Sequence, residues 1–283
     1  MINLKNIEEK LSKVQERYIS FMVDNLKDWQ LWAEASQKMV AGKEVNKKEI
    51  PDFFHSEYEW AKIVLEMEDQ GGFNWQDPRI ADLFAAAAQT PFYKLWGDTI
   101  TEISLCLVEL SGAETLIEIG AGRGNLTRDM LIKMSQKNIS VPLFASDANE
   151  AVLNNVANLS NKFPNQQLQT YLWDVNNTPD DSLKKQIKEP VVLYERASIT
   201  YATYGCLENI GQVADVIVLG DYFNCTGELF AYDTMFDKIG VKPLFYKDVE
   251  PLILQHFPNQ YLFDKEVHDS TGLPNITLVI AWK

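Results

Sequence analysis

Three glycines at alternate positions constrain this chain more than any other feature of its sequence. Gly120, Gly122 and Gly124 follow an apolar run that ends at Ile119, and a helix-forming stretch begins at Asn125. Glycine adopts positive φ without a steric penalty and allows a ligand to approach the backbone closely. The helix that follows presents free N–H groups in its first turn. The pattern therefore predicts a strand, a ligand-binding loop and a helix in direct succession.

The spacing of the glycines distinguishes between two kinds of nucleotide-binding loop. A dinucleotide fingerprint requires Gly-x-Gly-x-x-Gly, and that frame would need its third glycine where Asn125 stands. The frame present is Glu-x-Gly-x-Gly-x-Gly, which begins at Glu118. A dehydrogenase is therefore disfavoured. The alternative is a tight turn with no ligand, but such a turn would not require the conformational entropy that three glycines lose.

Downstream of Gly112, short apolar runs alternate with helical stretches. Helices are expected between most members of a series of strands at Thr115–Ile119, 141–146, 168–173, 191–194 and 216–219. This alternation is typical of parallel strands joined by crossover helices on both faces of a sheet. Two later apolar runs, 260–267 and 276–282, flank Ser270-Thr271-Gly272. They predict an antiparallel hairpin.

Acidic residues follow the second and third of these strands. Asp147 comes directly after the run 141–146, and Asp174 after the run 168–173. Ligands of α/β sheets bind at the carboxyl ends of the strands, where a carboxylate can accept strong hydrogen bonds from hydroxyl groups. Two alternatives are open. Asp147 could cap a helix near Asn149, and Asp174 could belong to a surface turn.

Together these motifs resemble those of the Rossmann-like (class I) S-adenosylmethionine-dependent methyltransferases. The resemblance spans residues 91–283 and implies a seven-stranded, mostly parallel, doubly wound α/β sheet with a C-terminal antiparallel hairpin. It implies S-adenosylmethionine as the cofactor, with the glycine loop around its amino-acid end. It also implies that the acidic residue two positions before the first glycine orders the loop, that the second strand's acid binds ribose, and that the third strand's acid binds the adenine amino group beside Trp173. The matching cofactor-binding positions are Glu118, Gly120, Gly122, Gly124, Asp147 and Asp174.

The first 90 residues match no cofactor motif. Apolar residues from Ile7 to Met39 recur at three- and four-residue steps, which indicates a helical stretch. Further helices are expected at 57–67, ending at Gly71-Gly72, and at 78–88. In the resembled family such extensions often cover the substrate. We therefore expect a helical cap over residues 1–90 and a methyltransferase domain over 91–283.

The acceptor should contact the ends of the fourth and fifth strands. Methyl transfer from a sulfonium depends above all on alignment, and the need for a base depends on the nucleophile. The sequence does not identify the catalytic group. Glu195 could form a local ion pair with Arg196, the tyrosines could be core or rim residues, and the histidine could lie in a solvated loop. The candidates are Glu195, Tyr201, Asp221, Tyr222 and His268.

Metal chemistry is a weaker hypothesis. Glu195, Asp221 and Asn224 carry the oxygen atoms that magnesium prefers, as in the catechol-type O-methyltransferases. That group has an Asp-Asn pair, however, whereas here Tyr222 follows Asp221. We therefore assign no metal. The three cysteines form no Cys-x-x-Cys pair, and Cys106 is expected to be a small buried apolar residue.

Net charge restricts the class of acceptor. The chain carries a formal charge of -14 at pH 7, which repels a phosphate backbone. The Asn-Pro-Pro-aromatic and Pro-Cys signatures of DNA methyltransferases are also missing from the sequence. Nucleic acid is thus disfavoured, and we expect transfer to an oxygen or nitrogen of a small molecule or peptide. Alternatives are transfer of another group from the same cofactor, or an inactive methyltransferase-like binding module.

Location and assembly are constrained only weakly. No apolar run approaches the length of a membrane span, and charged residues near the start do not suit a signal peptide. We expect a cytoplasmic protein without a membrane partner. The oligomeric state is left open, with a homodimer as one alternative.

Overall fold

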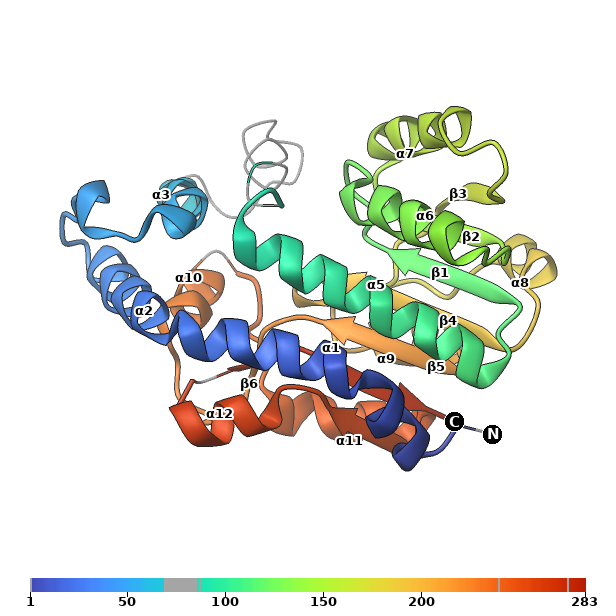
Figure 1. The fold of residues 1–283 in the computed structure, drawn as a ribbon. Coiled ribbons are helices and arrows are strands. Elements are labelled where there is room, and N and C mark those ends of the chain that lie inside the picture. Colours follow the sequence, from blue (N-terminus) through green and yellow to red (C-terminus); the bar gives the residue numbers. More distant parts are fainter. Residues whose placement is uncertain (1, 69–85, 87, 239, 274) are drawn as a thin grey trace.

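A seven-stranded sheet forms the centre of the protein (Figure 1), as seen in a computed structural model that describes residues 2–68, 86, 88–238, 240–273 and 275–283. The strand order is β3-β2-β1-β4-β5-β9-β7. Strand β9 (Val279–Trp282) runs antiparallel to both of its neighbours, β5 and β7 (Asn259–Leu262). The parallel strands are β1 (Thr115–Ile119), β2 (Leu143–Asp147), β3 (Leu168–Leu172), β4 (Val191–Arg196) and β5 (Val216–Gly220). The predicted fold class is therefore confirmed.

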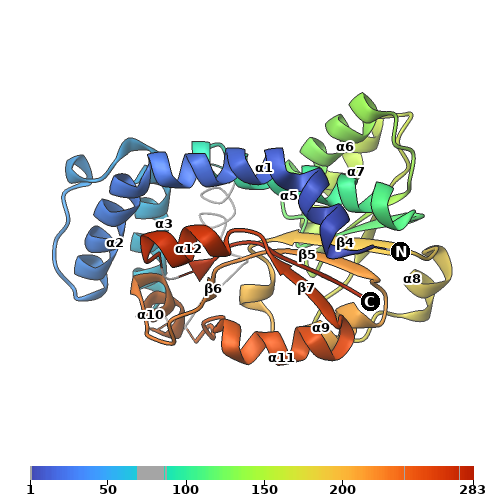
Figure 2. The same cartoon turned by 60° about the horizontal axis from the view of Figure 1, so that its bottom comes forward.

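Helices cover both faces of this sheet, as Figure 2 shows. Successive residues of a buried strand point to opposite faces, so Leu116 enters one hydrophobic core and Ile117 the other. Helices α1 (Leu4–Asp24) and α5 lie on the first face, and α9 and α11 on the second. The crossover and covering helices are α5 (Pro91–Ser111), α6 (Asn125–Lys137), α7 (Glu150–Ala157), α8 (Asp181–Gln186), α9 (Cys206–Gly211) and α11 (Tyr246–His256).

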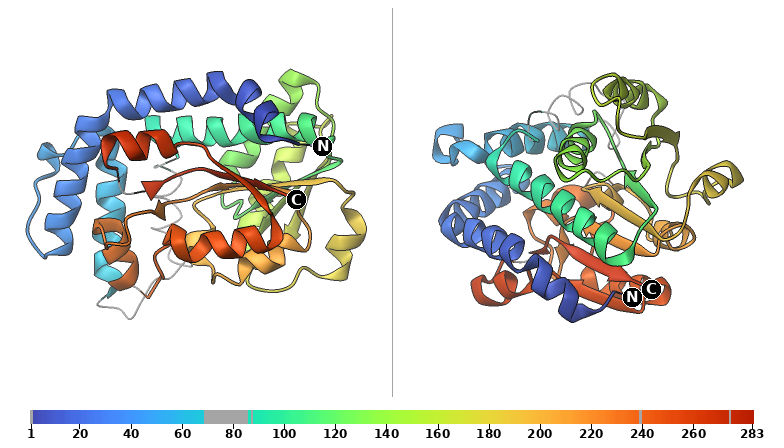
Figure 3. Two further views of the ribbon diagram at one scale, coloured as in Figure 1. Left: turned by 90° about the horizontal axis from the view of Figure 1, so that it is seen from below. Right: turned by 45° about the vertical axis from the view of Figure 1, so that its right-hand side comes forward.

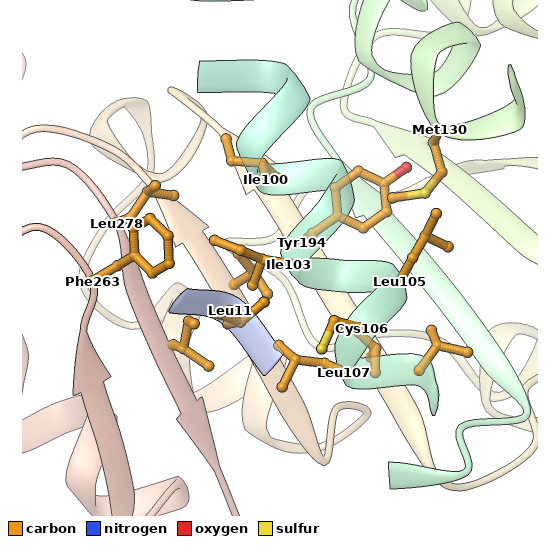
Figure 4. Close-up of a cluster of buried hydrophobic side chains, with 14 of the residues drawn as sticks. Leu11, Ile100, Ile103, Leu105, Cys106, Leu107, Met130, Tyr194, Phe263 and Leu278 are labelled. Carbon is orange, nitrogen blue, oxygen red and sulfur yellow. The ribbon is translucent and has the colours of Figure 1, made fainter. Parts of the chain in front are cut away.

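Helix α5 is the main element of the first core. It begins after Thr90 with Pro91 in its first turn and ends at Gly112, which has a φ of 66°. Proline suits the first turn, and glycine suits a left-handed position after the last. In Figure 4, Ile103 and Leu107 of α5 lie beside Leu11 of α1. Cys106 is buried in the same core, which confirms its expected apolar role (Figure 4).

The N-terminal helices divide between two packing clusters. Helix α1 lies along α5, as Figure 3 shows, whereas α2 (Leu26–Val40) and α3 (His55–Glu68) pack with α10 (Ala231–Lys238). The predicted continuous helical stretch is broken at Asn25. Helices on the N-terminal side of residue 90 thus pack against helices on its C-terminal side in both clusters. The division into two domains stays a prediction. Apart from residues 86 and 88, the predicted helix at 78–88 lies outside the described residues, as does Gly71-Gly72.

The predicted C-terminal hairpin is wrong in its connection, although its antiparallel pairing is present. The chain leaves β7 at Leu262 and forms α12 (Lys265–Thr271) and then β8 (Asn275–Ile276) before β9. Strand β8 pairs with β6 (Phe223–Asn224) in a second, two-stranded sheet. Just beyond the end of β7, the Asp264 carboxylate accepts from the backbone N–H groups of Thr277 and Leu278, and α12 follows directly.

A buried polar network attaches α1 to this C-terminal region. The Tyr18 hydroxyl lies 2.6 Å from the Thr277 hydroxyl, which donates to Asp264 at 2.6 Å. Burial raises the pKa of Asp264 to about 6, against the hydrogen bonds from Thr277. Buried polar groups of this kind are stable only when they are hydrogen-bonded. The network therefore fixes the position of α1 on the sheet.

In the described part of the chain, no helix combines the length and apolar character that a membrane crossing needs.

We expect Tyr18→Phe to lower the free energy of unfolding by about 1–2 kcal/mol, because it removes one buried hydrogen bond. Tyr171→Phe is the control, since the Tyr171 hydroxyl bonds to exposed groups and should matter by less than about 0.5 kcal/mol. Urea unfolding measures both. An equal effect of the two substitutions would contradict the role given to the network.

Candidate active site

A cavity of about 610 Å³ lies at the carboxyl ends of the first four strands. Its volume falls within the range of about 300–1,000 Å³ that is usual for small-molecule sites. In an open α/β sheet this edge is where ligands bind. The walls come from the loops after β1, β2, β3 and β4, together with Ala88 and Tyr93 beside the start of α5.

The glycine loop forms the floor of this cavity with the backbone geometry that the sequence predicts. Gly120, Gly122 and Gly124 have φ values of 64°, 51° and 76°, in the region that other residues rarely adopt. A Cβ on Gly120 would lie 2.1 Å from the Ser198 hydroxyl oxygen. Gly124 directly precedes α6. The loop thus requires glycine for conformation at all three positions and for space at the first.

Glu118 lies behind the loop rather than in the cavity wall. Its buried carboxylate accepts a hydrogen bond of 2.9 Å from the Tyr194 hydroxyl of β4. Burial raises the pKa of Glu118 to about 7, while the Tyr194 hydroxyl acts to lower it. The Glu118 backbone carbonyl accepts from the Ser146 hydroxyl at 2.7 Å. These bonds join β1 to both of its neighbours immediately before the glycine loop.

Asp147 lies in the cavity wall at the end of β2. One carboxylate oxygen accepts from Gly122 N and the other from Asn149 N, each at 2.9 Å. Burial raises the pKa of Asp147, against these backbone donors. The cap of α7 is the Asn149 side chain, which accepts from Ala151 N. The alternative of Asp147 as the helix cap is therefore wrong.

Trp173 and Asp174 lie in the same wall, just beyond β3, which ends at Leu172. The Asp174 carboxylate accepts from the backbone and side-chain N–H groups of Asn176 and from the side chain of Asn177. The turn expected as an alternative is thus present, and Asp174 also lines the cavity. The Trp173 ring is buried and donates to the Asn177 carbonyl at 3.0 Å.

Glu195 and Arg196 project to opposite faces of the sheet, because they are neighbours on β4. The expected ion pair between them is therefore wrong. The Arg196 guanidinium lines the cavity, donates to the Tyr93 carbonyl at 3.1 Å and lies 5.8 Å from the centre of the Tyr93 ring. A Cβ on Gly97 would lie 2.6 Å from the guanidinium. Sequence reasoning missed this cation, although strand alternation was the signal that could have placed it.

Glu195 and Asp221 are fully buried and do not line the cavity. Glu195 accepts from Ser198 N at 2.8 Å, and Asp221 accepts from Thr200 N at 2.9 Å. Burial, and then the charge of Asp221, raise the pKa of Glu195 well above its usual range. Burial raises the pKa of Asp221 to about 7. The two carboxyls hold the backbone of the cavity wall, and Tyr201 follows directly in that wall.

Asn224 does not complete a metal site with these two carboxyls. Its carbonyl oxygen accepts from Thr226 N and Gly227 N, and its amide donates to Asp233. In the described ranges, no three His, Cys, Asp or Glu side chains group as metal ligands would.

The remaining catalytic candidates differ in whether they line the cavity. Tyr201 lines the cavity, whereas Tyr222 does not and is hydrogen-bonded to Tyr93. His268 lies on α12 rather than in a hairpin loop, where its ring bonds to the Leu273 carbonyl, and it does not line the cavity. Tyr93 carries no motif and was missed, because only folding brings α5 to this edge of the sheet.

Comparison with known proteins identifies the fold through solved structures. No protein-family model and no curated protein matches this chain. Among solved structures, it is similar to the CMeT domain of the citrinin polyketide synthase, with a TM-score of 0.56 and 14% identity over 74% of this chain and 57% of that one. It is also similar to the DszA carbon methyltransferase, with a TM-score of 0.57 and 15% identity over 73% and 58%.

A geranyl diphosphate methyltransferase solved with S-adenosylmethionine gives a TM-score of 0.50 and 10% identity over 74% of this chain and 91% of that one. This chain therefore spans well under two thirds of the first two neighbours, at 57% and 58%. Identities this low establish the fold alone. That fold is the class I methyltransferase fold.

We expect Gly120→Ala to lower the free energy of unfolding more than Gly112→Ala does. Both residues have similar positive φ values, 64° and 66°, but only the first lacks space for a Cβ. Gly112→Ala should cost about 1–2 kcal/mol for its conformation, which isolates the steric part at Gly120. Ser198→Gly removes the two atoms that clash and should restore Gly120→Ala to the cost of Gly112→Ala. Urea unfolding of Gly120→Ala, Gly112→Ala, Ser198→Gly and the Gly120→Ala/Ser198→Gly double variant measures this. Equal costs for the two single alanine substitutions would contradict the close packing.

We also expect the stability to fall as pH rises through neutrality. In the unfolded chain Glu195 and Asp221 ionise near their ordinary pKa values, whereas burial keeps the folded pair protonated to higher pH. The folded state then binds more protons, so stability is present at acidic pH and is lost as pH rises through about 7. The loss is about 1.4 kcal/mol per unit of raised pKa.

Thermal unfolding between about pH 5 and pH 8 measures this dependence. Glu195→Gln should reduce the slope of the profile but not remove it, because Asp221, Glu118 and Asp264 also have raised pKa values. Glu208→Gln, which changes an exposed carboxyl on α9, should leave the slope unchanged. A midpoint that rises with pH would contradict the assignment.

Proposed function

We propose that this protein binds S-adenosylmethionine and transfers its methyl group to a small-molecule or peptide acceptor. One observation carries the proposal. The glycine loop, Asp147, Trp173 and Asp174 meet in one cavity at the carboxyl edge of a sheet with the class I methyltransferase fold. A neighbour of this fold, the geranyl diphosphate methyltransferase, was solved in complex with S-adenosylmethionine.

The residues in the cavity wall fit each part of this cofactor. Asp147 offers a carboxylate to ribose hydroxyls, and Asp174 offers an acceptor for the adenine amino group, with the Trp173 ring beside it. Arg196 lines the cavity and lies close enough to Glu118 for their charges to interact, and its guanidinium suits the carboxylate of the amino-acid end. When bound, the cofactor supplies an electrophilic methyl group on a sulfonium.

The chain's own contribution is alignment and the exclusion of water. Tyr93 and Tyr201 contribute aromatic side chains to the cavity wall. Glu195 and Asp221 fix the backbone at 198–200 and thereby the position of Tyr201. Alignment of this kind is the main requirement of a displacement at a methyl group.

The acceptor atom is the finer part of the proposal. Oxygen and nitrogen are the atoms expected from the sequence, but one neighbour is named a carbon methyltransferase. Carbon therefore joins the set of acceptor atoms to test. The mass of the product separates methyl transfer from transfer of another group derived from the same cofactor.

Calorimetry with S-adenosylmethionine, S-adenosylhomocysteine and NAD tests the cofactor. We expect binding of the first two and no binding of NAD. Binding of NAD alone would overturn the interpretation of the glycine loop. Binding of none of the three would favour an inactive module.

Asp147→Ala should weaken S-adenosylmethionine binding about tenfold or more, because hydrogen bonds to a charged group are worth about 1.5–3 kcal/mol. Asp147→Asn should weaken it as well, while it keeps an oxygen for one of the two backbone donors. Asp181→Ala, which removes an exposed carboxyl in the first turn of α8, is the control. Calorimetry gives the affinities, and circular dichroism confirms that the variants fold. Unchanged affinity in both Asp147 variants would remove the assignment.

A further inference from the structure

Arg196, at the end of β4, carries a guanidinium group that the fold positions but does not neutralise. The residue is partly buried, lines the cavity and donates to the Tyr93 carbonyl at 3.1 Å. Glu118, whose charge reaches it, is hydrogen-bonded to Tyr194 instead, and the described residues provide no carboxylate within ion-pair distance of Arg196. A cation withdrawn from water without a counter-ion is unfavourable. Such a group is therefore expected to meet an anionic ligand.

The space for this guanidinium is built into α5 at Gly97. This glycine lies in the interior of a helix of 21 residues, where glycine is less favourable than alanine. Its φ is not among the positive values, so conformation does not require glycine there. A Cβ on Gly97 would lie 2.6 Å from Nη1 of Arg196 and 3.3 Å from Cδ1 of Leu126. The helix thus carries an unfavourable residue where alanine would push the guanidinium aside.

The charged groups of the cavity wall are separated between its two sides. The acidic residues come from the segments after β2 and β3, and are Asp147, Glu150 and Asp174. On the side of β4 the wall contains Arg196, Tyr93 and Tyr201, and the described residues add no carboxylate to it. In the proposed cofactor complex, S-adenosylmethionine brings a sulfonium and an ammonium group against a single carboxylate. The side of the cavity at β4 therefore stays positive when the cofactor is bound.

We propose that Arg196 binds a carboxylate group of the acceptor, and that the acceptor carries this group on an aromatic or apolar body. The proposal rests on the proposed methyltransferase function. Four of the five guanidinium N–H groups remain after the bond to Tyr93, and a bidentate carboxylate takes two of them. The carboxylates of the cofactor and of the acceptor can thus share this cation. Tyr93, Ala197 and Tyr201 provide rings and a methyl group against which the acceptor's body can pack.

Calorimetry with 3-phenylpropanoate and its neutral analogue 3-phenylpropan-1-ol measures this selectivity. The protein is saturated with S-adenosylhomocysteine at about pH 7.5, where the probe's carboxyl group is ionised. We expect the wild type to bind the carboxylate about tenfold or more tightly than the alcohol, because only the carboxylate forms charge-assisted hydrogen bonds.

Arg196→Gln removes the charge but keeps a donor for the Tyr93 carbonyl. It should weaken binding of 3-phenylpropanoate alone, so that the two probes bind with affinities within about twofold of each other. A merely structural role would weaken both probes equally. Arg128→Gln is the matched control and should retain the preference, because Arg128 pairs with Asp129 at 3.1 Å and does not line the cavity.

Gly97→Ala tests the position of the cation without changing its charge. The added Cβ displaces the guanidinium, so the preference for the carboxylate should fall. The free energy of unfolding should not fall, because alanine is the better residue in a helix interior. Unchanged preference in this variant would contradict the positioning by Gly97.

The same titrations in the presence of 5′-methylthioadenosine, which lacks the amino-acid end, separate the two carboxylates. If Arg196 serves the cofactor alone, 3-phenylpropanoate will be preferred only in that complex, because S-adenosylhomocysteine then occupies the guanidinium. That result would overturn the proposal. So would no binding of 3-phenylpropanoate by the wild type, equal affinity for the two probes, an unchanged preference in Arg196→Gln, or an equal loss of both probes in that variant.

The S-adenosylhomocysteine titration on the same samples separates this inference from the proposed function. Cofactor binding without a preference for the carboxylate overturns only the role of Arg196 toward the acceptor. Failure of cofactor binding overturns both.

Discussion

The hydrogen bond from Tyr194 to the buried carboxylate of Glu118 lies where the two central strands meet, directly before the glycine loop. It fixes the register of β1 against β4 at the level where the cavity begins. Arg196 lies two residues beyond Tyr194 and therefore shares its face, which brings a cation beside the same carboxylate. The loop on one strand and the charged wall on the other are thus placed by one contact. The rest of the cavity is arranged around this pair.

The segment after β4 shows how that arrangement is maintained. Ala197 has a φ of 52°, an unusual value for a residue with a side chain, and donates to the Gly220 carbonyl at 2.6 Å. Backbone of this kind persists only where its surroundings determine it. Glu195 and Asp221 hold this backbone by accepting hydrogen bonds from Ser198 N and Thr200 N, and Ser198 packs against Gly120. Glu195, which projects to the second face of the sheet, therefore helps to fix the wall of a cavity that Arg196 lines on the first face.

The sequence was sufficient where a function depends on neighbouring residues. The strand, loop and helix around Gly122 are local, and alternation of apolar runs predicts the parallel strands. It was insufficient where residues far apart in the chain meet. The role of Arg196 depends on a space left by Gly97, and Tyr93 enters the cavity wall only through the packing of α5 on β4. Helix α12 was missed because the carboxylate that ends β7, Asp264, bonds to groups thirteen or more residues away.

The helical cluster that contains α10 is not a continuous piece of the chain. Its helices α2 and α3 come from the N-terminal part, and α10 comes from the segment between β6 and α11. Helix α1, which precedes them, packs on α5 and is bonded to Thr277. Removal of the first forty residues would therefore uncover the apolar side of α5 and also take α2 away from α3 and α10. An exchange of this cluster between proteins of this fold would have to graft two separate segments, and the packing of α1 on α5 would have to be preserved at the same time.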